Sequence, residues 1–545
     1  MHLQVIICFA LLIWWPDPPP VEPIVESPAW TGLIVAAYLA SLSLGAVGIS
    51  TRALRRLSRP GGGERAQHLY HRGTTVLRLT AVSAYAAILF LTRWVEIIRS
   101  SPWLSPVPGL VDLTVVLPFL AGATLIFAGT YPIDRALHGM ILRSRAWEGA
   151  RARKVWSFRQ YLLFNTRHHL LVVVVPMILI LAAFDLARDH REVLARVFRV
   201  QWAAEAVPAV AAGAVFVIAP VMLRYIWPTR PLPPGALRTA LEGICARIGL
   251  RCRDILVWQS GGMMVNAAVM GLFPRVRYVL LSDGLLETMT PNQVEAVFGH
   301  EAGHIRLRHI HYFLLFAICT MLILSGVVEG LRLGVEHGLF ELDVVAIEGI
   351  GLGVILLIWG GAFGWLSRRF ERQADLFGAR CVTPTDPRAC HLPCSVHDCA
   401  GGGRPDGAVC ATAAATFTSA LDRVAVLNGI PHEERSWRHS SIASRMRFLV
   451  SLAGDPLRLR SFERLIRRAK TALVVGAVVG CLLAGLYVWH HPLYGIGVGV
   501  DGTETGTAAH PILRSGSVDR HDARTHHRWQ GPGSQHPSEN RRAGR

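Results

Sequence analysis

The sequence predicts a mainly α protein, in which a polytopic membrane helix bundle carries a smaller α+β domain outside the bilayer. Three observations indicate this fold class. Hydrophobic residues make up 51% of the 545 residues and gather in long runs. Arginines collect in alternate loops between these runs, which is the charge pattern of multi-pass membrane proteins. After residue 228 the pattern changes to short β-branched and amphipathic stretches, which are typical of an α+β domain.

Eight apolar runs are long enough to cross a bilayer as helices, which takes ~20 residues. We expect these spans at about 30–50, 75–96, 109–129, 168–186, 203–226, 311–331, 344–366 and 470–489. A ninth run, residues 3–15, is shorter and resembles the apolar part of a signal peptide. It lacks a basic leader and a small-residue cleavage site, which favours an uncleaved first helix over a cleaved segment.

The charge of the loops predicts how the spans are oriented. The arginine-rich loops 51–74 and 135–167 should face the cytoplasm, and the acidic or nearly uncharged loops 16–29 and 332–343 should face outward. The net charge of +18 is therefore explained by loops at a membrane surface. We expect the lipid bilayer to be a partner and exclude nucleic acid.

The extramembrane part of the chain is interrupted by a pair of spans. Counting crossings places residues 227–310 and 367–469 on the same cytoplasmic side of a cell inner membrane or plasma membrane, because an even number of spans separates them. The expected organisation is an N-terminal bundle (1–227), a first extramembrane part (228–310), a transmembrane hairpin (311–366), a second extramembrane part (367–469), a last transmembrane helix (470–489) and a disordered tail (490–545).

The most informative motif lies within residues 294–311, VEAVFGHEAGHIRLRHIH, where His300, Glu301 and His304 form H-E-x-x-H. Residues four apart lie on one face of a helix, so both imidazoles can bind one metal ion. Glu301 is rotated by ~100° around the axis and can reach a water beside that ion. Two nitrogens, an open position and a nearby carboxylate are the arrangement of a zinc hydrolase.

A third protein ligand is needed before this motif indicates a catalytic zinc, because H-E-x-x-H can occur by chance in a chain with 23 His. Residues 367–375 read SRRFERQAD, and Glu371 and Asp375 are again four apart. We expect Glu371 to complete a two-histidine, one-glutamate set. Asp375 can then hold a ligand histidine by a hydrogen bond.

Two further histidines follow the motif, at positions 309 and 311. His311 lies seven residues beyond His304, about two helical turns or ~10 Å away. That distance is too long for a zinc bond of ~2 Å. We therefore interpret His309 and His311 as interfacial residues where the zinc helix continues directly into the next span.

The chain resembles the integral-membrane gluzincins that include the HtpX heat-shock protease and the CAAX prenyl protease. The resemblance lies in the order of its motifs: H-E-x-x-H, then an apolar stretch, then S-R-x-x-E-x-x-A-D. The resemblance runs from about residue 228 to 449 and includes Asn266-Ala267, Gly271 and the stretch LLSDGLLETMTPNQVEAV. It implies a zinc-metalloprotease domain of the gluzincin type, with His300, His304 and Glu371 as zinc ligands.

The resemblance also implies residues that contact the substrate. In this family the stretch matching Asn266 and Ala267 lines the cleft as an edge strand, which can bind a peptide as an added strand. An ordinary hairpin strand is the alternative. His439 and Arg445 match a pair that approaches the cleft and can stabilise an oxyanion, and a surface histidine is the alternative for His439. The family usually has proline after this histidine, whereas this chain has Ser440.

A cluster of cysteines follows the third ligand. A second, structural zinc at Cys390, Cys394, Cys399 and Cys410 is one interpretation. The spacings are not C-x₂-C, however, and the expected cytoplasmic setting disfavours disulfides. Free thiols in a glycine-rich loop are therefore the favoured alternative.

The sequence as a whole predicts a membrane-embedded zinc metalloendopeptidase that hydrolyses peptide bonds at the cytoplasmic membrane face. Its expected partners are protein or peptide substrates, chiefly membrane proteins, and the favoured role is quality control of such proteins. Two alternatives stay open: a CAAX-type processing protease, and a membrane sensor or scaffold whose protease domain is regulatory or silent. A transporter fits least, because charged residues within the spans are scarce.

Overall fold

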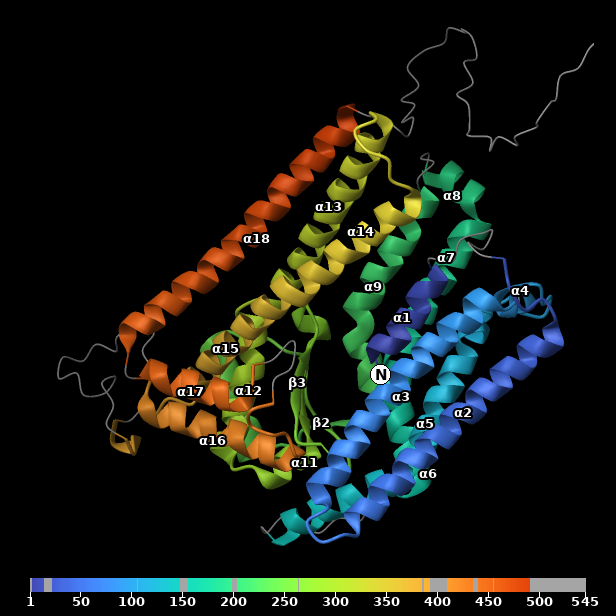
Figure 1. Cartoon of the computed structure of the whole chain (residues 1–545). Coiled ribbons are helices and arrows are strands. Elements are labelled where there is room, and N and C mark those ends of the chain that lie inside the picture. Colours follow the sequence, from blue (N-terminus) through green and yellow to red (C-terminus); the bar gives the residue numbers. More distant parts are fainter. Residues whose placement is uncertain are drawn as a thin grey trace, which may run out of the picture. The chain divides into compact units, whose positions relative to one another are not determined.

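The helical membrane bundle predicted from the sequence is confirmed. The computed structural model describes residues 2–13, 22–104, 106–147, 155–198, 203–262, 264–384, 387–392, 409–434, 440–453 and 455–490. Within these residues, eight helical segments are long and apolar enough to cross a membrane (Figure 1). They comprise α2 (Pro28–Leu57), α3 (Gly63–Leu91), α5 (Leu110–Trp147), α6 (Phe158–Asn165) with η1 (Thr166–Leu171) and α7 (Val172–Asp189), α9 (Ala203–Ile226), α13 (His309–Glu336), α14 (Val344–Leu357) with η3 (Ile358–Phe363) and α15 (Gly364–Cys381), and α18 (Pro456–His490).

The N-terminal run forms α1 (His2–Ile13), a helix of 12 residues that is too short to span a bilayer by itself. Val5, Cys8 and Phe9 on this helix are fully buried among residues of α3, α5 and η1. Tyr85 and Phe119 belong to the same core, where their rings lie 5.7 Å apart. The first helix is therefore part of the bundle's core.

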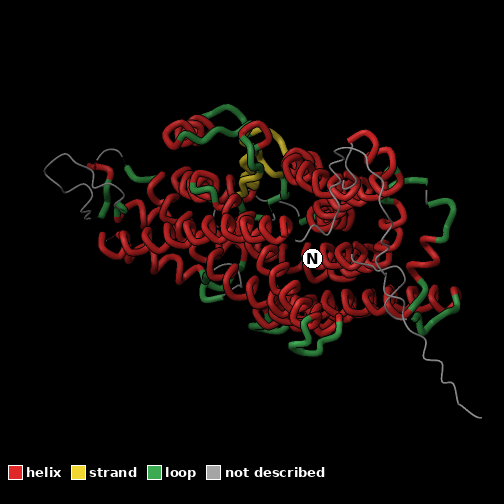
Figure 2. The backbone as a smooth tube through the Cα atoms, turned by 90° about the horizontal axis from the view of Figure 1, so that it is seen from above, coloured by secondary structure: helices red, strands yellow, loops and turns green. Residues whose placement is uncertain are grey.

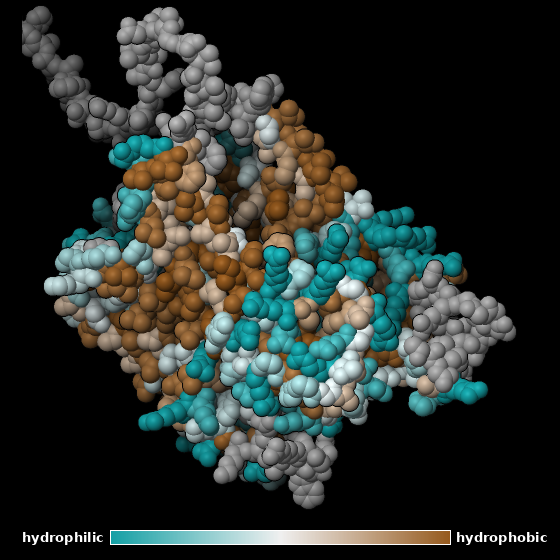
Figure 3. Space-filling model, turned by 180° about the vertical axis from the view of Figure 1, so that it is seen from behind, coloured by the Kyte–Doolittle hydropathy of each residue, from teal (hydrophilic) through white to brown (hydrophobic). Residues whose placement is uncertain are grey.

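The outer faces of the spanning helices are hydrophobic. Large apolar side chains such as Leu44, Met321 and Leu357 are more than two-thirds exposed. Figure 3 shows hydrophobic residues covering wide, continuous areas on one face of the molecule. Exposed apolar areas of that extent are unfavourable in water, so these faces are suited to contact with lipid.

A four-stranded sheet lies outside this core, with strand order β1-β2-β4-β3. Its strands are β1 (Thr229–Pro231), β2 (Asp254–Trp258), β3 (Ala267–Met270) and β4 (Tyr278–Ser282). The two central strands, β2 and β4, are parallel, with Asp254 opposite Tyr278. The strand β3 pairs only with β4, antiparallel, and is therefore an edge of the sheet. Figure 2 shows the strands as one small group among many helices.

Helices cover the sheet and complete a second hydrophobic core. They are α10 (Ala236–Ile248), α11 (Asp283–Thr288), α12 (Pro291–Arg306), α16 (Ala411–Asn428) and α17 (Ile442–Ala453), together with α15. Phe298 of α12, Phe417 of α16 and Leu281 of the central strand β4 are buried in this same core. We refer to β1–β4 with these six helices as the α+β region.

The remaining regular elements are short connections. They are α4 (Trp94–Arg99), α8 (Arg191–Phe198), η2 (Pro274–Val276) and η4 (Pro387–Ala389). None of them contributes to the site described below.

The helix that carries H-E-x-x-H begins at a strong cap and ends at a break. The hydroxyl of Thr290 accepts a hydrogen bond from the Gln293 amide, the Gln293 side chain caps the Thr290 amide in return, and Pro291 occupies the first turn. The expectation that this helix continues directly into the next span is wrong. Arg308 adopts a left-handed backbone conformation, with φ of 59°, between α12 and α13.

Candidate metal centre

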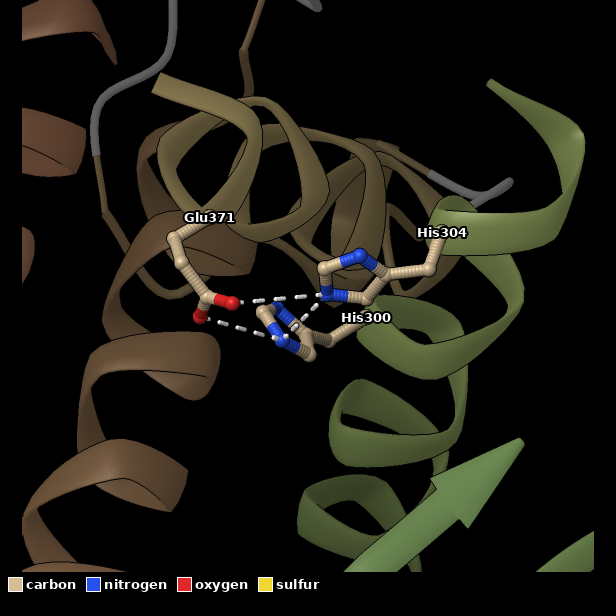
Figure 4. Close-up of side chains that lie close together, drawn as sticks. All are labelled: His300, His304 and Glu371. Atoms are coloured by element: carbon tan, nitrogen blue, oxygen red, sulfur yellow. Dashed lines mark hydrogen bonds and ion pairs between the residues drawn. The ribbon is translucent and has the colours of Figure 1, made fainter. Parts of the chain in front are cut away.

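Three side chains predicted from the sequence as ligands meet in the structure. His300 and His304 project from α12, and Glu371 projects toward them from α15 (Figure 4). The carboxylate oxygens of Glu371 lie 3.8 Å from Nε2 of each histidine, and the two Nε2 atoms lie 3.3 Å apart. Ligand atoms of a tetrahedral zinc, each at about 2.1 Å, are separated by roughly 3.4 Å. The three residues therefore fit one metal ion.

Close packing between α12 and α15 brings Glu371 within this reach. A β-carbon at Gly378 would lie 2.9 Å from the backbone nitrogen of His300, and one at Gly299 would lie 2.8 Å from the β-carbon of Cys381. Real β-carbons do not approach other atoms this closely. Glycine at these two positions therefore allows the ligand helices to lie against each other.

His300 is held by a charged network. Its Nδ1 lies 2.9 Å from a carboxylate oxygen of Asp375, which is 1% exposed. Arg445 donates from Nε and from Nη2 to the two oxygens of the same carboxylate. Because Asp375 accepts at Nδ1, the lone pair on Nε2 of His300 faces the position of the metal.

His304 is held by a chain of neutral groups. Its Nδ1 lies 3.0 Å from Nδ1 of His309, whose Nε2 lies 3.0 Å from the amide oxygen of Gln373. An amide oxygen can only accept, so Nε2 of His309 carries the proton and its Nδ1 accepts from His304. The lone pair on Nε2 of His304 is then also directed toward the metal position. Two lone pairs that face each other at 3.3 Å suit a cation between them.

The interpretation of His309 as an interfacial residue is wrong, and the part that His309 and Gln373 play at the centre was not predicted from the sequence. His309 is fully buried, and its ring stacks on Phe370 at 4.3 Å. Residues five apart, such as 304 and 309, do not share a face of a continuous helix. The break at Arg308 brings them together, and a left-handed arginine has no recognisable sequence signal. His311, in contrast, is exposed.

The electrostatic environment of the centre separates its titrating groups. Burial raises the pKa of Glu301 to about 7, with the charge of His300 opposing this effect and that of Glu371 adding to it. Burial and the neighbouring His300 lower the pKa of His304 to about 4, so this imidazole is neutral and able to bind a metal at neutral pH. The pKa of His300 is raised overall. Burial acts to lower it, but the hydrogen bond to Asp375 and the charge of that carboxylate have the larger effect.

The edge strand β3 lies beside the centre. Glu301 accepts a hydrogen bond from the backbone of Val269. Ala267 is the first residue of β3, and the exposed Asn266 precedes it. The backbone amide of Asn266 donates a hydrogen bond to the Ser282 hydroxyl over 2.9 Å. The side-chain oxygen of Asn266 accepts from the amide of Ala267. One edge of β3 is thus engaged by β4, and the strand adjoins the carboxylate of the H-E-x-x-H motif.

Several predicted residues lie elsewhere or outside the described part of the chain. His439, Cys394 and Cys399 are outside the described residues. The sulfurs of Cys390 and Cys410 lie 3.5 Å apart. Among the residues that the structure describes, the only group of three or more candidate ligands is His300, His304 and Glu371, so a second structural ion at the cysteines is not supported.

Comparison with known proteins gives consistent results. Residues 234–429 match the model of Peptidase family M48. A Protease HtpX homolog of Pyrobaculum calidifontis is 29% identical over 175 residues, which are 31% of this chain and 48% of that protein. A CAAX prenyl protease 1 homolog of Oryza sativa subsp. japonica is 26% identical over 172 residues, 30% of this chain and 39% of that protein. The chain spans about half the length of the curated relatives it matches.

A solved structure, that of S. mikatae Ste24p, aligns with 79% of this chain and with all of its own chain, at 14% identity and a TM-score of 0.40. The spanning helices and the convergent side chains define a multi-pass membrane protein with two histidines and one glutamate placed so that they could hold a metal ion. This group lies within residues 234–429, the segment that matches the model of Peptidase family M48.

Proposed function

We propose that this protein is a zinc metalloendopeptidase that hydrolyses peptide bonds in membrane proteins at the cytoplasmic face of an inner or plasma membrane. The observation that carries the proposal is the convergence of His300, His304 and Glu371 beside the partly buried Glu301. Two histidines and one glutamate leave a coordination position open, which distinguishes catalytic from structural zinc sites. Family membership and relatives named as proteases support the same activity.

The proposed chemistry assigns a role to each side chain. A bound Zn²⁺ would supply Lewis-acid polarisation of the attacking water and of the scissile carbonyl. Glu301 takes the proton from the water and passes it to the nitrogen of the leaving amine. A carboxylate within reach of that water can accept its proton and return it to the leaving group. Asp375 and Arg445 hold His300 in place, and His439 is expected to donate to the developing oxyanion.

The edge strand β3 supports a mode of substrate binding. A peptide that adds to β3 at Asn266 and Ala267 would lie along α12, and Val269 connects this strand to Glu301. Binding of this kind uses backbone hydrogen bonds and depends little on side chains. Such tolerance favours quality control of many membrane proteins over CAAX-type processing. A sensor with one substrate and a silent scaffold are the remaining candidate functions.

The test uses the purified full-length protein with two substitutions. Glu301→Gln should keep one zinc per chain and lower kcat by about 10²–10⁴-fold, because only proton transfer is removed. His304→Ala should lose both the zinc and the activity. The measurements are zinc content and cleavage of an unfolded membrane protein.

Full turnover by Glu301→Gln would falsify the proposed mechanism. A cellular phenotype that Glu301→Gln rescues as well as the parent would select the scaffold. A comparison of cleaved fragments across the proteome distinguishes a sensor from a quality-control protease, because a sensor should cleave one protein and a quality-control protease should cleave many.

A further inference from the structure

A cavity of about 260 Å³ lies within the helical bundle, far along the chain from the metal ligands. Its walls come from α3, α5, α6 and η1, with Met264 from the connection between β2 and β3 at one side. Tyr70, Thr74 and Arg78 line it from α3, one helical turn apart. The cavity is unusual for a membrane bundle because most of the groups that line it are polar.

The one carboxylate in the cavity already has partners. Asp134 of α5 accepts a hydrogen bond from the Tyr70 hydroxyl over 3.0 Å at one oxygen. Its other oxygen lies 3.1 Å from Nδ1 of His138, one turn further along the same helix. Both oxygens of Asp134 are thus engaged.

Arg78 lines the same cavity without such a partner. Among the described residues, no hydrogen bond or ion pair reaches its guanidinium, and its Nε is buried. Arg78 also lies inside the candidate span α3. A charged side chain in a membrane span is costly unless it is paired, and for that reason it marks a functional position.

We propose that this cavity binds a phosphate group, with Arg78 as its principal ligand. A guanidinium can donate two parallel hydrogen bonds to phosphate oxygens, and because both oxygens of Asp134 have other partners, the donors of Arg78 are left for a ligand. Trp156 and Tyr161 in the wall are the residue types that lie at the headgroup level of a bilayer. The cavity is smaller than the roughly 300–1,000 Å³ of pockets for drug-sized ligands, so it accommodates a headgroup and not a peptide.

The ligand chemistry has two sources, a phospholipid headgroup and free phosphate. The test is thermal unfolding of the full-length protein in detergent and phosphate-free buffer. Three probes are added separately: dihexanoylphosphatidylglycerol, dihexanoylglycerol without phosphate, and inorganic phosphate. The variants are Arg78→Gln and, as a matched control on the same helix, the exposed Arg72→Gln.

The phospholipid should raise the Tm of the parent and of Arg72→Gln in a saturable way, and its affinity for Arg78→Gln should fall by at least about tenfold. Dihexanoylglycerol should give no shift that depends on Arg78. A shift with the phospholipid alone assigns the site to a headgroup, and a shift with inorganic phosphate assigns the same site to free phosphate. Arg78→Lys keeps the charge but loses the paired donors, so it should bind the phospholipid more weakly than the parent and more tightly than Arg78→Gln, which separates a lost ligand from a misfolded protein. Equal binding by the parent and Arg78→Gln, or an Arg78-dependent shift with dihexanoylglycerol, would overturn the proposal.

Discussion

The two histidines of the metal centre are held by chemically different partners. His300 contacts the ion pair of Asp375 with Arg445, whereas His304 contacts the neutral pair of His309 with Gln373. Asp375 and Gln373 lie on the same helix, α15, two residues apart. One helix therefore orients both imidazoles, with a carboxylate on one side and an amide on the other.

We call Asp375 with Arg445 the charged support and His309 with Gln373 the neutral support. The difference between them predicts unequal consequences when one or the other is lost. Hydrogen bonds to ionised groups are roughly twice as strong as neutral ones, and an isolated buried charge is far more costly than an unpaired neutral group. The charged support should therefore determine both folding and metal affinity. The neutral support should act mainly on the tautomer and orientation of His304.

The largest effect is expected from Asp375→Asn. This change leaves the buried guanidinium of Arg445 without its main partner and should lower the free energy of unfolding by about 3–5 kcal/mol. It should also weaken zinc binding by about 10–100-fold, because a residue that orients a ligand is altered. Thermal unfolding and competition with a chelator measure the two effects. A variant with unchanged Tm and affinity would show that the charged network is dispensable.

The next effect is expected from Gly378→Ala, which acts on both supports together. The added methyl group meets the ring of Phe417 on α16 and the backbone of His300 on α12, so α15 must move away from both helices, at a cost of about 1–3 kcal/mol. Zinc affinity should fall as Glu371 moves away from the histidines. The matched control is Gly243→Ala in α10, where no atom lies within 4 Å of the new β-carbon. If both variants behave alike, helix contact does not set the ligand geometry.

A smaller effect is expected from Gln373→Ala. Only a neutral hydrogen bond to His309 is lost, so the free energy of unfolding should fall by about 1 kcal/mol. Zinc affinity should fall by about tenfold, because His304 is less firmly oriented. Gln373→Glu keeps an acceptor at the same place and should restore the affinity. A loss in Gln373→Glu equal to that in Gln373→Ala would contradict the proposed chain of hydrogen bonds.

The smallest effect is the coupling between the two supports. Asp375 and Gln373 share no hydrogen-bond partner, so the destabilisation by Asp375→Asn and Gln373→Ala in metal-free protein should be additive to within about 0.5 kcal/mol. A double-mutant cycle of thermal unfolding without zinc measures this quantity. A coupling energy well above that limit would mean that the four residues form a single network.

Much of this architecture was predictable from local sequence patterns. The eight spans follow from apolar length, α10, α16 and α17 follow from helical patterns, and β2 and β4 follow from their β-branched and aromatic residues. The three candidate ligands were predictable because spacing of four places paired residues on one helical face, and each pair occupies a single helix, α12 or α15.

The parts that were not predictable depend on tertiary geometry. The role of His309 requires the backbone break at Arg308, and the role of Gln373 requires the rotation of α15 relative to α12. The cavity around Arg78 brings together residues between 70 and 169 with Met264, which no periodicity connects. His439 lies outside the described residues, and its assignment stays a prediction.

The break at Arg308 has a mechanical consequence. His309, which fixes the tautomer of His304, is the first residue of α13, and α13 is a candidate membrane span. A change in the tilt of that helix would therefore move one support of the metal centre while α12 stays in place. Helices adapt to bilayer thickness by tilting. Bilayer thickness would then change the affinity of the centre for its metal ion.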